Sequence, residues 1–246
     1  MTIKEIAKSL FRRFGLDVQL LQTRDAFTIQ KQLLRAVNVN VIVDAGAHEG
    51  EWTSNYRAAF PLARVFAFEP FPETAAKFKA RFDTDPMVKL IPSALGECQR
   101  TASFHVNQLA ATNSLFPADE HASTLLPDSS WIINKGAIEV SVTSLDHFIQ
   151  NESIDRIGIL KMDIQGGELQ ALHGAKDLLR DKKVDLIYTE MMVGPHYSGQ
   201  GLYFDICGLL DKFDYPLYSF YNLAINHKGR LGWLDAIFVR RSLIEE

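Results

Sequence analysis

Cysteine is scarce in this sequence. Its 246 residues include two cysteines, Cys98 and Cys207, which lie far apart and belong to no CxxC or Cys/His ligand pattern. Because zinc sites and disulfide frameworks need several such residues at short, regular spacings, the sequence predicts neither of them. Two isolated thiols are typical of a protein from a reducing compartment.

Long apolar runs are also missing. No uninterrupted apolar stretch approaches the roughly 18 residues that a membrane span needs. The first residues lack the apolar core and the small-residue cleavage site of a signal peptide. These absences predict a protein without a transmembrane segment, and together with the isolated cysteines they favour a cytoplasmic location.

The sequence has no excess of basic residues. It contains 26 lysines and arginines against 30 aspartates and glutamates, which gives a formal net charge of −4. Since nucleic-acid-binding proteins usually carry a basic excess, we expect no nucleic-acid partner. The 47% hydrophobic and 23% charged residues are ordinary for a globular protein, and the length suits one α/β domain with a small appendage.

Strand-like and helix-like segments alternate along most of the chain. The strand-like runs are short, apolar and rich in β-branched residues, and helix-sized intervals separate them. Such runs predict parallel strands that helices cover on both faces. We expect strands at residues 39–44, 64–69, 88–93, 157–163 and 184–190, a helix at 72–82, and two terminal strands at 215–221 and 233–239 with a turn at 226–229 between them.

The N-terminal residues have a helical pattern. Apolar residues recur at helical spacing from Ile3 to Phe14, with lysines and arginines on the other face, and a second helical pattern runs from Ile29 to Val37. We therefore predict a helical extension over residues 1–38 and the main domain over 39–246. A basic amphipathic helix can lie on a membrane surface, but a helix that docks against the domain with its basic face in solvent is favoured.

A long irregular segment separates the third and fourth strands. Residues 101–106 and 139–143 have the alternation of short strands, whereas the residues between them are rich in Ser, Thr, Asn, Pro and Asp. A segment of that length without clear structure is more often a lid or a binding loop than a connector. We expect an inserted loop over about 107–138.

A glycine-containing loop follows the first strand. It has the sequence DAGAHEG from Asp44 to Gly50, and Gly46 and Gly50 let the backbone turn sharply and approach a ligand closely. Open α/β sheets bind ligands at the carboxyl edge where this loop lies. The spacing is not the GxGxxG of dinucleotide-binding proteins. Asp44 instead suits the ammonium group of a ligand with an amino-acid tail.

A second acid ends the second strand. Glu69 lies where a carboxylate can accept hydrogen bonds from both hydroxyls of a ribose. The glycine loop and this acid together predict a nucleotide-type ligand. The alternative is a tight turn between a strand and a helix, with a solvated glutamate.

Six motifs occur in order between residues 41 and 175. They are VIVDAGAHEGEW at 41–52, FAFEPFPET at 66–74, SALGE at 93–97, TNSL at 112–115, SVTSLD at 141–146 and LKMDIQGGELQALHGA at 160–175. Together they resemble the FkbM-type methyltransferases. The resemblance implies an S-adenosylmethionine-dependent O-methyltransferase with a Rossmann-like class I α/β fold, which here means a mostly parallel seven-stranded sheet with an antiparallel strand in the C-terminal hairpin and helices on both faces.

The resemblance also implies roles for individual residues. The chain has Gln165 where the family usually has glutamate. If that position helps to hold a cation, this chain has one negative charge fewer there, so we assign no metal ligand. The resemblance places Asp44, Gly46, His48 and Gly50 around the methionine part of S-adenosylmethionine, Glu69 at its ribose, Ser93 and Ala94 near its adenine, Asp163 between methyl donor and acceptor, and Asn113 and Ser114 over the cofactor or substrate.

Methyl transfer to a hydroxyl oxygen needs a group that removes or screens the hydroxyl proton. Asp163, Glu190 and His196 are the catalytic candidates, because they fall at or just beyond the carboxyl ends of the fourth and fifth strands. Asp163 has an alternative role as the cap of the next helix, and His196 is equally consistent with a surface histidine without a role. Glu168 either belongs to the site or complements the dipole of its helix.

The leading hypothesis is an S-adenosylmethionine-dependent methyltransferase that acts on a hydroxyl of a small molecule, a glycan or a natural product. Two alternatives stay open. A nicotinamide-dependent oxidoreductase would use a similar sheet, but the missing GxGxxG motif counts against it. A non-catalytic cofactor-binding protein would keep the fold without the chemistry, and Gln165 is the only hint of it.

Overall fold

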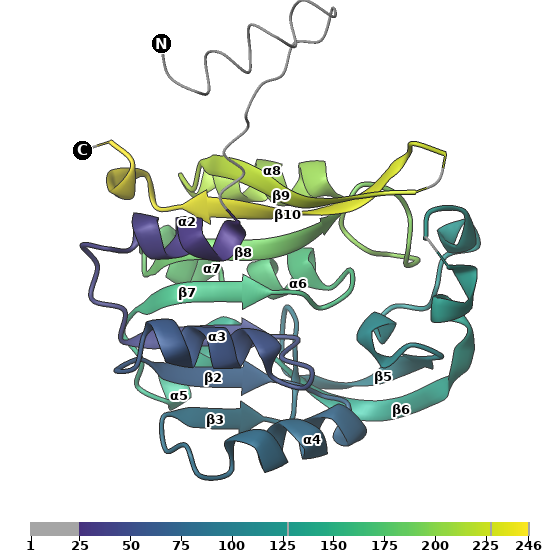
Figure 1. Ribbon diagram of the computed structural model, residues 1–246, viewed down its shortest axis with the longest axis horizontal. Coiled ribbons are helices and arrows are strands. Elements are labelled where there is room, and N and C mark those ends of the chain that lie inside the picture. The colour runs from purple at the N-terminus through teal and green to yellow at the C-terminus, as the bar shows by residue number, and fades with distance from the viewer. Residues whose placement is uncertain (1–24, 127, 227, 246) are drawn as a thin grey trace, which may run out of the picture.

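The computed structural model describes residues 25–126, 128–226 and 228–245 (Figure 1). The first predicted helix, at residues 3–14, lies outside these ranges. Within them, no helix has the length and apolar character needed to cross a membrane.

A seven-stranded sheet forms the centre of the fold. Its strands lie in the order β3-β2-β1-β7-β8-β10-β9. The first five pair in parallel, and β10 is antiparallel to both of its neighbours. This topology confirms the predicted fold class. The strands are β1 (Val41–Ala45), β2 (Arg64–Phe68), β3 (Val88–Ile91), β7 (Ile157–Met162), β8 (Val184–Met192), β9 (Leu217–Ile225) and β10 (Leu231–Val239).

Helices cover both faces of this sheet. On one face, Ile42 and Ile159 pack with residues of α2 and α3, and α4 lies on the same side (Figure 1). On the other face, Val43 and Leu160 pack with residues of the remaining helices. The first group is α2 (Ala26–Leu33), α3 (Glu51–Ala59) and α4 (Pro72–Phe82), and the second is α5 (Leu145–Asn151), α6 (Glu168–His173), α7 (Lys176–Arg180) and α8 (Tyr203–Lys212).

Local sequence explains where several helices begin. Asp25 accepts a 2.9 Å hydrogen bond from the backbone N–H of Thr28 at the start of α2, and Ser144 caps α5 in the same way. Pro72 occupies the first turn of α4, where its missing N–H costs nothing. The predicted helix at 72–82 and the second N-terminal helical pattern are therefore both present, the latter as α2.

A second, three-stranded sheet lies beyond the carboxyl ends of the parallel strands (Figure 1). It contains β4 (Ala94–Leu95), β6 (Asn134–Thr143) and β5 (Arg100–Asn107), in that order. The segment expected to be an inserted loop, 107–138, holds three short 3-10 helices and the first residues of β6. Those helices are η1 (Ala110–Thr112), η2 (Ala122–Thr124) and η3 (Ser129–Ile132).

We call residues 108–126 and 128–133 the cap. The cap packs on the loop after β8, because the backbone N–H of Asp119 donates to His196 O at 2.9 Å and that of Ser198 donates to Pro117 O at 2.9 Å. A small apolar cluster fixes the contact, and its buried members are Ala122, Leu126, Ile132, Met192 and Tyr197. The cap thus covers the main sheet at the carboxyl end of β8.

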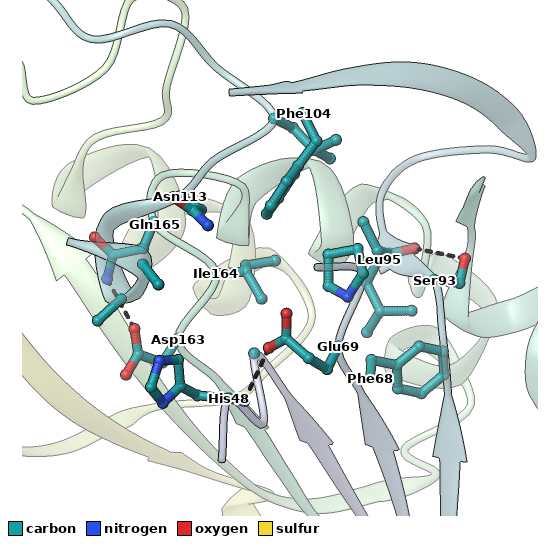
Figure 2. Close-up of a pocket in the computed structure, with 16 residues that line it drawn as sticks. His48, Phe68, Glu69, Ser93, Leu95, Phe104, Asn113, Asp163, Ile164 and Gln165 are labelled. Carbon is teal, nitrogen blue, oxygen red and sulfur yellow. Dashed lines mark hydrogen bonds between the residues drawn. The ribbon is translucent and has the colours of Figure 1, made fainter. Parts of the chain in front are cut away.

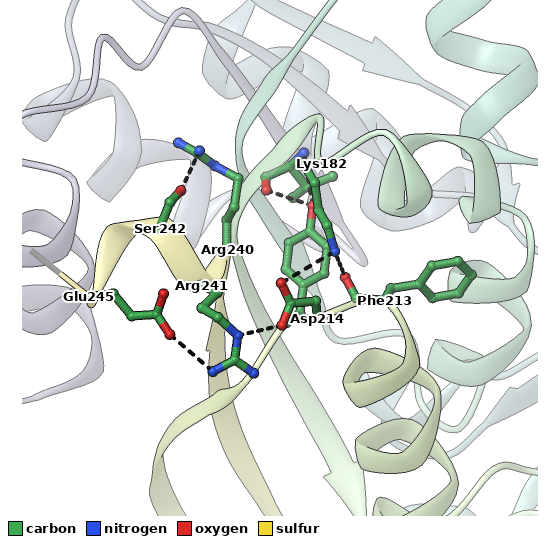
Figure 3. Close-up of polar contacts among 9 residues, drawn as sticks. Lys182, Phe213, Asp214, Arg240, Arg241, Ser242 and Glu245 are labelled. Carbon is green, nitrogen blue, oxygen red and sulfur yellow. Dashed lines mark hydrogen bonds and ion pairs between the residues drawn. The ribbon is translucent and has the colours of Figure 1, made fainter.

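Ion pairs connect segments near the amino end of β8, on the side of the sheet away from the carboxyl ends of the parallel strands. After β10, η4 (Arg241–Leu243) returns to the end of α8, where Arg241 pairs with Asp214 and, at 3.3 Å, with Glu245 (Figure 3). Lys182, which precedes β8, lies 3.9 Å from Asp214. The C-terminal residues therefore join α8 to the start of β8, far from the carboxyl edge.

Candidate functional site

A cavity lies at the carboxyl ends of β1, β2 and β7, between the main sheet and the second sheet (Figure 2). It contains about 660 Å³ of empty space, including space open to solvent. Its lining residues are Gly46, His48, Phe68, Glu69, Pro70, Ser93, Ala94, Leu95, Phe104, Ala110, Ala111, Asn113, Leu115, Asp163, Ile164 and Gln165.

The glycine loop after β1 forms the floor of this cavity. Gly46 has φ of +71°, and a Cβ atom there would lie 1.8 Å from the backbone oxygen of Asp163. Only glycine permits this close approach of the two strand ends. Gly50, with φ of +89°, does not line the cavity but begins α3 and packs against Phe78 and Phe82.

Asp44 supports the loop from below. Its carboxylate is fully buried and does not line the cavity. It lies 3.1 Å from Nζ of Lys161 and accepts a 2.7 Å hydrogen bond from Thr53. Lys161 also donates to the carbonyl oxygens of Ala45 and Gly46, at 3.2 and 2.9 Å. This geometry gives Asp44 a place in the support of the loop, rather than beside the ammonium group that we expected it to bind.

Lys161 is charged although it is buried. Burial by itself lowers the pKa of the ammonium group, but the carboxylates of Asp44 and Asp163 raise it by more, so the pKa lies above its ordinary value. Lys161 stands in the middle of an apolar strand and lies opposite Asp44 in the β1–β7 register.

Glu69 presents a carboxylate to the cavity. One oxygen accepts a 2.9 Å hydrogen bond from the backbone N–H of His48 and the other a 2.9 Å bond from that of Phe71. Figure 2 shows the first of these bonds across the cavity floor. Because a carboxylate has about four acceptor positions, each oxygen of Glu69 keeps room for one further donor. His48 itself adopts a φ of +49°, in the left-handed region that few residues other than glycine occupy.

The far end of the cavity is mostly apolar. Ser93 and Ala94 line it next to Leu95 and Phe104. The hydroxyl of Ser93 donates to the carbonyl oxygen of Ser141 at 2.8 Å, so it is held in place by the second sheet. This end suits a flat, weakly polar ring.

Asn113 brings an unused hydrogen-bond donor to the cavity. Its Oδ1 accepts a 2.8 Å bond from the backbone N–H of Asn107, whereas its buried Nδ2 has no partner among the described residues. A buried donor without a partner is costly unless a ligand or water satisfies it. Ser114 does not line the cavity and instead donates to the backbone oxygen of Gln165 at 2.7 Å.

The side-chain amide of Gln165 lies between the carboxylates of Asp163 and Glu190. Nε2 of Gln165 lies 2.9 Å from Oδ1 of Asp163 and 2.8 Å from Oε2 of Glu190. Asp163 lines the cavity and Glu190 does not. The hydroxyl of Tyr197 lies 2.8 Å from Oε1 of Gln165 and 2.9 Å from the carbonyl oxygen of Thr112, which links the amide to the cap.

Two buried acids near this amide, Glu190 and Glu168, resist ionisation. Burial raises the pKa of Glu190 well above its ordinary value, and the neighbouring carboxylates of Asp163 and Glu168 raise it further. Burial also raises the pKa of Glu168 to about 7, against the lowering effect of backbone N–H groups. One of those groups is the N–H of Ile164, which lies 2.8 Å from Glu168 Oε1.

His196 lies away from the cavity. It is 2% exposed, so it is not a surface histidine, and its ring packs edge-on against Trp233. Nδ1 donates to Gly194 O at 3.0 Å, and Nε2 has no partner among the described residues. Burial lowers the pKa of this histidine. Its role as a base stays a prediction without support from its position.

The cavity brings together most of the predicted cofactor residues. Tyr197, Lys161 and the apolar residues Phe104 and Leu115 were missed, because each belongs to the site through contacts between segments far apart in the sequence. Within the described ranges, no group of three or more His, Cys, Asp and Glu side chains has an arrangement that would hold a metal ion. The predicted residues that line the cavity are Gly46, His48, Glu69, Ser93, Ala94, Asn113 and Asp163.

The chain is similar to two named methyltransferases. It is 26% identical over 181 residues to 2-O-methyltransferase NoeI of Sinorhizobium fredii (strain NBRC 101917 / NGR234), which covers 71% of this chain and 72% of the relative. It is 26% identical over 145 residues to Methyltransferase 1 of Beauveria bassiana (strain ARSEF 2860), which covers 55% of this chain and 58% of that protein.

A solved structure and a family model agree with this similarity. Methyltransferase FkbM from Methylobacillus flagellatus KT matches 82% of this chain with a TM-score of 0.51 and 19% identity, and the match spans 44% of that protein's chain. At this identity the likeness supports the fold alone. The model of the Methyltransferase FkbM domain matches residues 44–217, which is more than half of the chain. The chain therefore belongs to the FkbM methyltransferase family.

Proposed function

We propose that this protein transfers a methyl group from S-adenosylmethionine to a hydroxyl oxygen of a small molecule or a glycan. The observation that carries the proposal is the cavity itself. Four features line it together: the floor at Gly46, the carboxylate of Glu69, the carboxylate of Asp163 and the unused donor of Asn113. The name of the relative NoeI, a 2-O-methyltransferase, supports oxygen as the receiving atom.

The residues of the cavity fit the cofactor. Glu69 has free acceptor positions for two ribose hydroxyls, the apolar end beside Ala94 and Phe104 suits the adenine ring, and the loop of Gly46 and His48 approaches closely enough to hold the methionine part. Asn113 supplies a donor that needs a partner. Asp44 contributes indirectly, through Lys161, by fixing the loop.

The acid at the end of β7 is the proposed proton acceptor. When bound, S-adenosylmethionine supplies an electrophilic methyl group on its sulfonium. Asp163 lines the same cavity, and among the described residues no hydrogen bond reaches its Oδ2. That oxygen would take the proton of the acceptor hydroxyl as the hydroxyl oxygen bonds to the methyl carbon and the bond from that carbon to the sulfonium sulfur breaks, which leaves a neutral thioether. Glu190 acts through its link to Asp163 rather than by touching the acceptor.

The proposed acceptor is a hydroxyl compound and not a nucleic acid, since the chain has a net charge of −4. A cytoplasmic location stays our prediction. It is consistent with the two free cysteines, Cys98 and Cys207.

The direct test is a transfer assay. The full chain is incubated with S-adenosylmethionine and a panel of sugars, oligosaccharides and phenols that carry free hydroxyls, and each acceptor is examined by mass spectrometry. We expect at least one acceptor to gain the mass of one methyl group while S-adenosylhomocysteine is released. Methylation of an amine or a thiol, with no hydroxyl compound modified, would contradict the proposal.

A further inference from the structure

The side chain of Gln165 joins several segments of the chain. Its Nε2 lies 2.9 Å from Oδ1 of Asp163 and 2.8 Å from Oε2 of Glu190, and its Oε1 lies 2.8 Å from the hydroxyl of Tyr197. Its backbone oxygen accepts a 2.7 Å hydrogen bond from Ser114 in the cap. The amide is thus fixed by partners at the end of β7, on β8 and in the loop after β8.

The chemistry of these partners allows one orientation of the amide. Nε2 carries two hydrogens and donates both, whereas Oε1 only accepts. If the amide were turned over, its oxygen would face the carboxylates of Asp163 and Glu190, and both contacts would be repulsive. In the observed orientation each carboxylate receives one N–H, and Tyr197 can donate to the amide oxygen. Figure 2 shows the bond from Gln165 to Asp163 at the edge of the cavity.

The backbone at this position is also specialised. Gln165 has φ of +53° and is followed by Gly166 with φ of +91°. Residues other than glycine and asparagine seldom adopt such values. A glutamine keeps this conformation when its surroundings over-determine it, and here Gln165 has polar contacts with the end of β7, with β8, with the loop after β8 and with the cap.

We call Asp163 and Glu190 the acid pair. Without the amide of Gln165, the surroundings of this pair would favour a bound proton. Glu190 is buried, and its desolvation and the neighbouring carboxylates of Asp163 and Glu168 raise its pKa. The amide opposes this tendency, because a hydrogen bond donated to a carboxylate stabilises its charged form. The titratable groups that act on the pair are Lys161 on β7, Glu168 on α6, Tyr188 on β8, Asp235 on β10 and Tyr197 in the loop after β8.

We propose that Gln165 is a positioning residue for the proton acceptor. Its amide donates to the facing oxygens of Asp163 and Glu190, which stabilises the charged form of the pair and leaves the other oxygen of Asp163 available to the cavity. The catalytic part of this inference rests on the proposed function. The hydroxyl proton then passes to Oδ2 of Asp163, and the carboxyl group so formed later returns the proton to solvent.

Two variants of equal charge test whether the amide of Gln165 affects protonation of Asp163 and Glu190, and the test needs no methyl acceptor. Gln165→Glu removes both donors and adds a carboxylate to the pair, whereas Gln99→Glu adds the same carboxylate at an exposed turn. The two full-length variants have identical compositions. Potentiometric titration should find about one more proton bound to Gln165→Glu than to Gln99→Glu at pH 7. Equal proton counts would overturn the proposal.

A second variant covers the case in which Gln165→Glu does not fold. Gln165→Met keeps the length of the side chain and adds no titratable group, so its titration compares directly with that of the wild type. We expect it to take up a proton at higher pH than the wild type does, because the pair has lost both donors. Superimposable titration curves would contradict the proposed role.

The pH dependence of turnover separates positioning from mere structural support. In Gln165→Glu, we expect the acid limb of the kcat profile to move upward by about one pH unit or more, so that kcat at pH 7 falls about tenfold, while Gln99→Glu keeps the wild-type profile. A structural defect would instead lower kcat by the same factor at every pH, and that result would refute the inference. If the wild type transfers no methyl group, the proposed function fails, but the proton counts still test the role of Gln165.

Discussion

Asp163 is the residue on which the proposed chemistry depends most. It is the carboxylate of the acid pair that lines the cavity. We predict that Asp163→Asn lowers kcat by about 10²–10⁴-fold, the usual contribution of a positioned acid or base, because the amide cannot take the hydroxyl proton. The affinity for S-adenosylmethionine, measured by calorimetry, should change much less. Near-normal turnover in this variant would remove Asp163 from its proposed role.

Gly46 is the residue whose size limits the floor of the cavity. A methyl group at this position would collide with the backbone oxygen of Asp163, 1.8 Å away, and the φ of +71° is unfavourable for alanine. We predict that Gly46→Ala weakens binding of S-adenosylmethionine by about tenfold or more, measured by calorimetry.

Gly208 in α8 offers a matched control for that variant. A Cβ atom there would meet no atom within 4 Å. Gly208→Ala should therefore raise the free energy of unfolding by about 0.5–1 kcal/mol and leave the cofactor affinity unchanged. Equal losses of affinity in the two alanine variants would show that the floor is not limited by the contact between Gly46 and Asp163.

At the scale of elements, the pairing of β1 with β7 depends on one buried ion pair. Lys161→Met leaves the Asp44 carboxylate buried without its cation, which typically costs about 3–5 kcal/mol. We predict a loss of that size in the free energy of unfolding, measured by urea denaturation. The double variant Lys161→Met/Asp44→Asn should recover most of it, because no unpaired charge remains. A double variant as unstable as the single one would contradict this account.

Most strands and helices could be predicted because their signals are local. The β-branched run at 41–45 and the Pro72 start of α4 are such signals. Two strands of the second sheet, β5 and β6, were expected from the alternation at 101–106 and 139–143. The third could not be anticipated in the same way, since β4 contributes two residues and pairs with β6 more than 40 positions later. The cap has little periodicity of its own, and packing against the loop after β8 determines its structure.

Part of the candidate site could be predicted, because its signals are also local in the sequence. Glycines and acids at strand ends identify Gly46, Glu69 and Asp163 from the sequence alone. The roles of Lys161 and Gln165 depend on which side chains lie opposite them across the sheet, and this follows from register rather than from spacing. His196 falls at the predicted edge in sequence, but the turn after β8 directs it into the interface with Trp233.

At the scale of the whole molecule, the buried acid Glu168 couples stability to pH. Burial raises its pKa from 4.5 to about 7. Between these values the folded chain holds a proton that the unfolded chain has released, so the free energy of unfolding decreases as the pH rises through this window. The shift corresponds to a total of about 3 kcal/mol.

We predict that Glu168→Gln removes this part of the pH dependence. Urea denaturation at pH 5 and pH 8 should show a loss of about 2.5 kcal/mol that the wild type suffers and the variant does not. Glu97→Gln, at an exposed position, serves as the control and should behave as the wild type does. The same pH dependence in all three proteins would mean that Glu168 ionises normally in the folded chain.

The charge of the molecule is organised around the cavity. Among the acids at the carboxyl ends of the strands, Asp44 is paired with Lys161, and the pKa of Glu190 is raised. Glu69 and Asp163 are the acids that line the cavity. The proposed attraction for a sulfonium would therefore be local to the cavity rather than a property of the net charge.

Calorimetric titration of the full chain with S-adenosylmethionine, S-adenosylhomocysteine and NAD tests the central claim most directly. The account predicts that the first two bind with dissociation constants of about 1–100 µM and that NAD does not bind. Glu69→Gln should bind both about tenfold more weakly, because an N–H of the new amide would face the backbone N–H of His48 or Phe71. Absence of heat with both sulfur compounds, or tighter binding of NAD, would contradict the account.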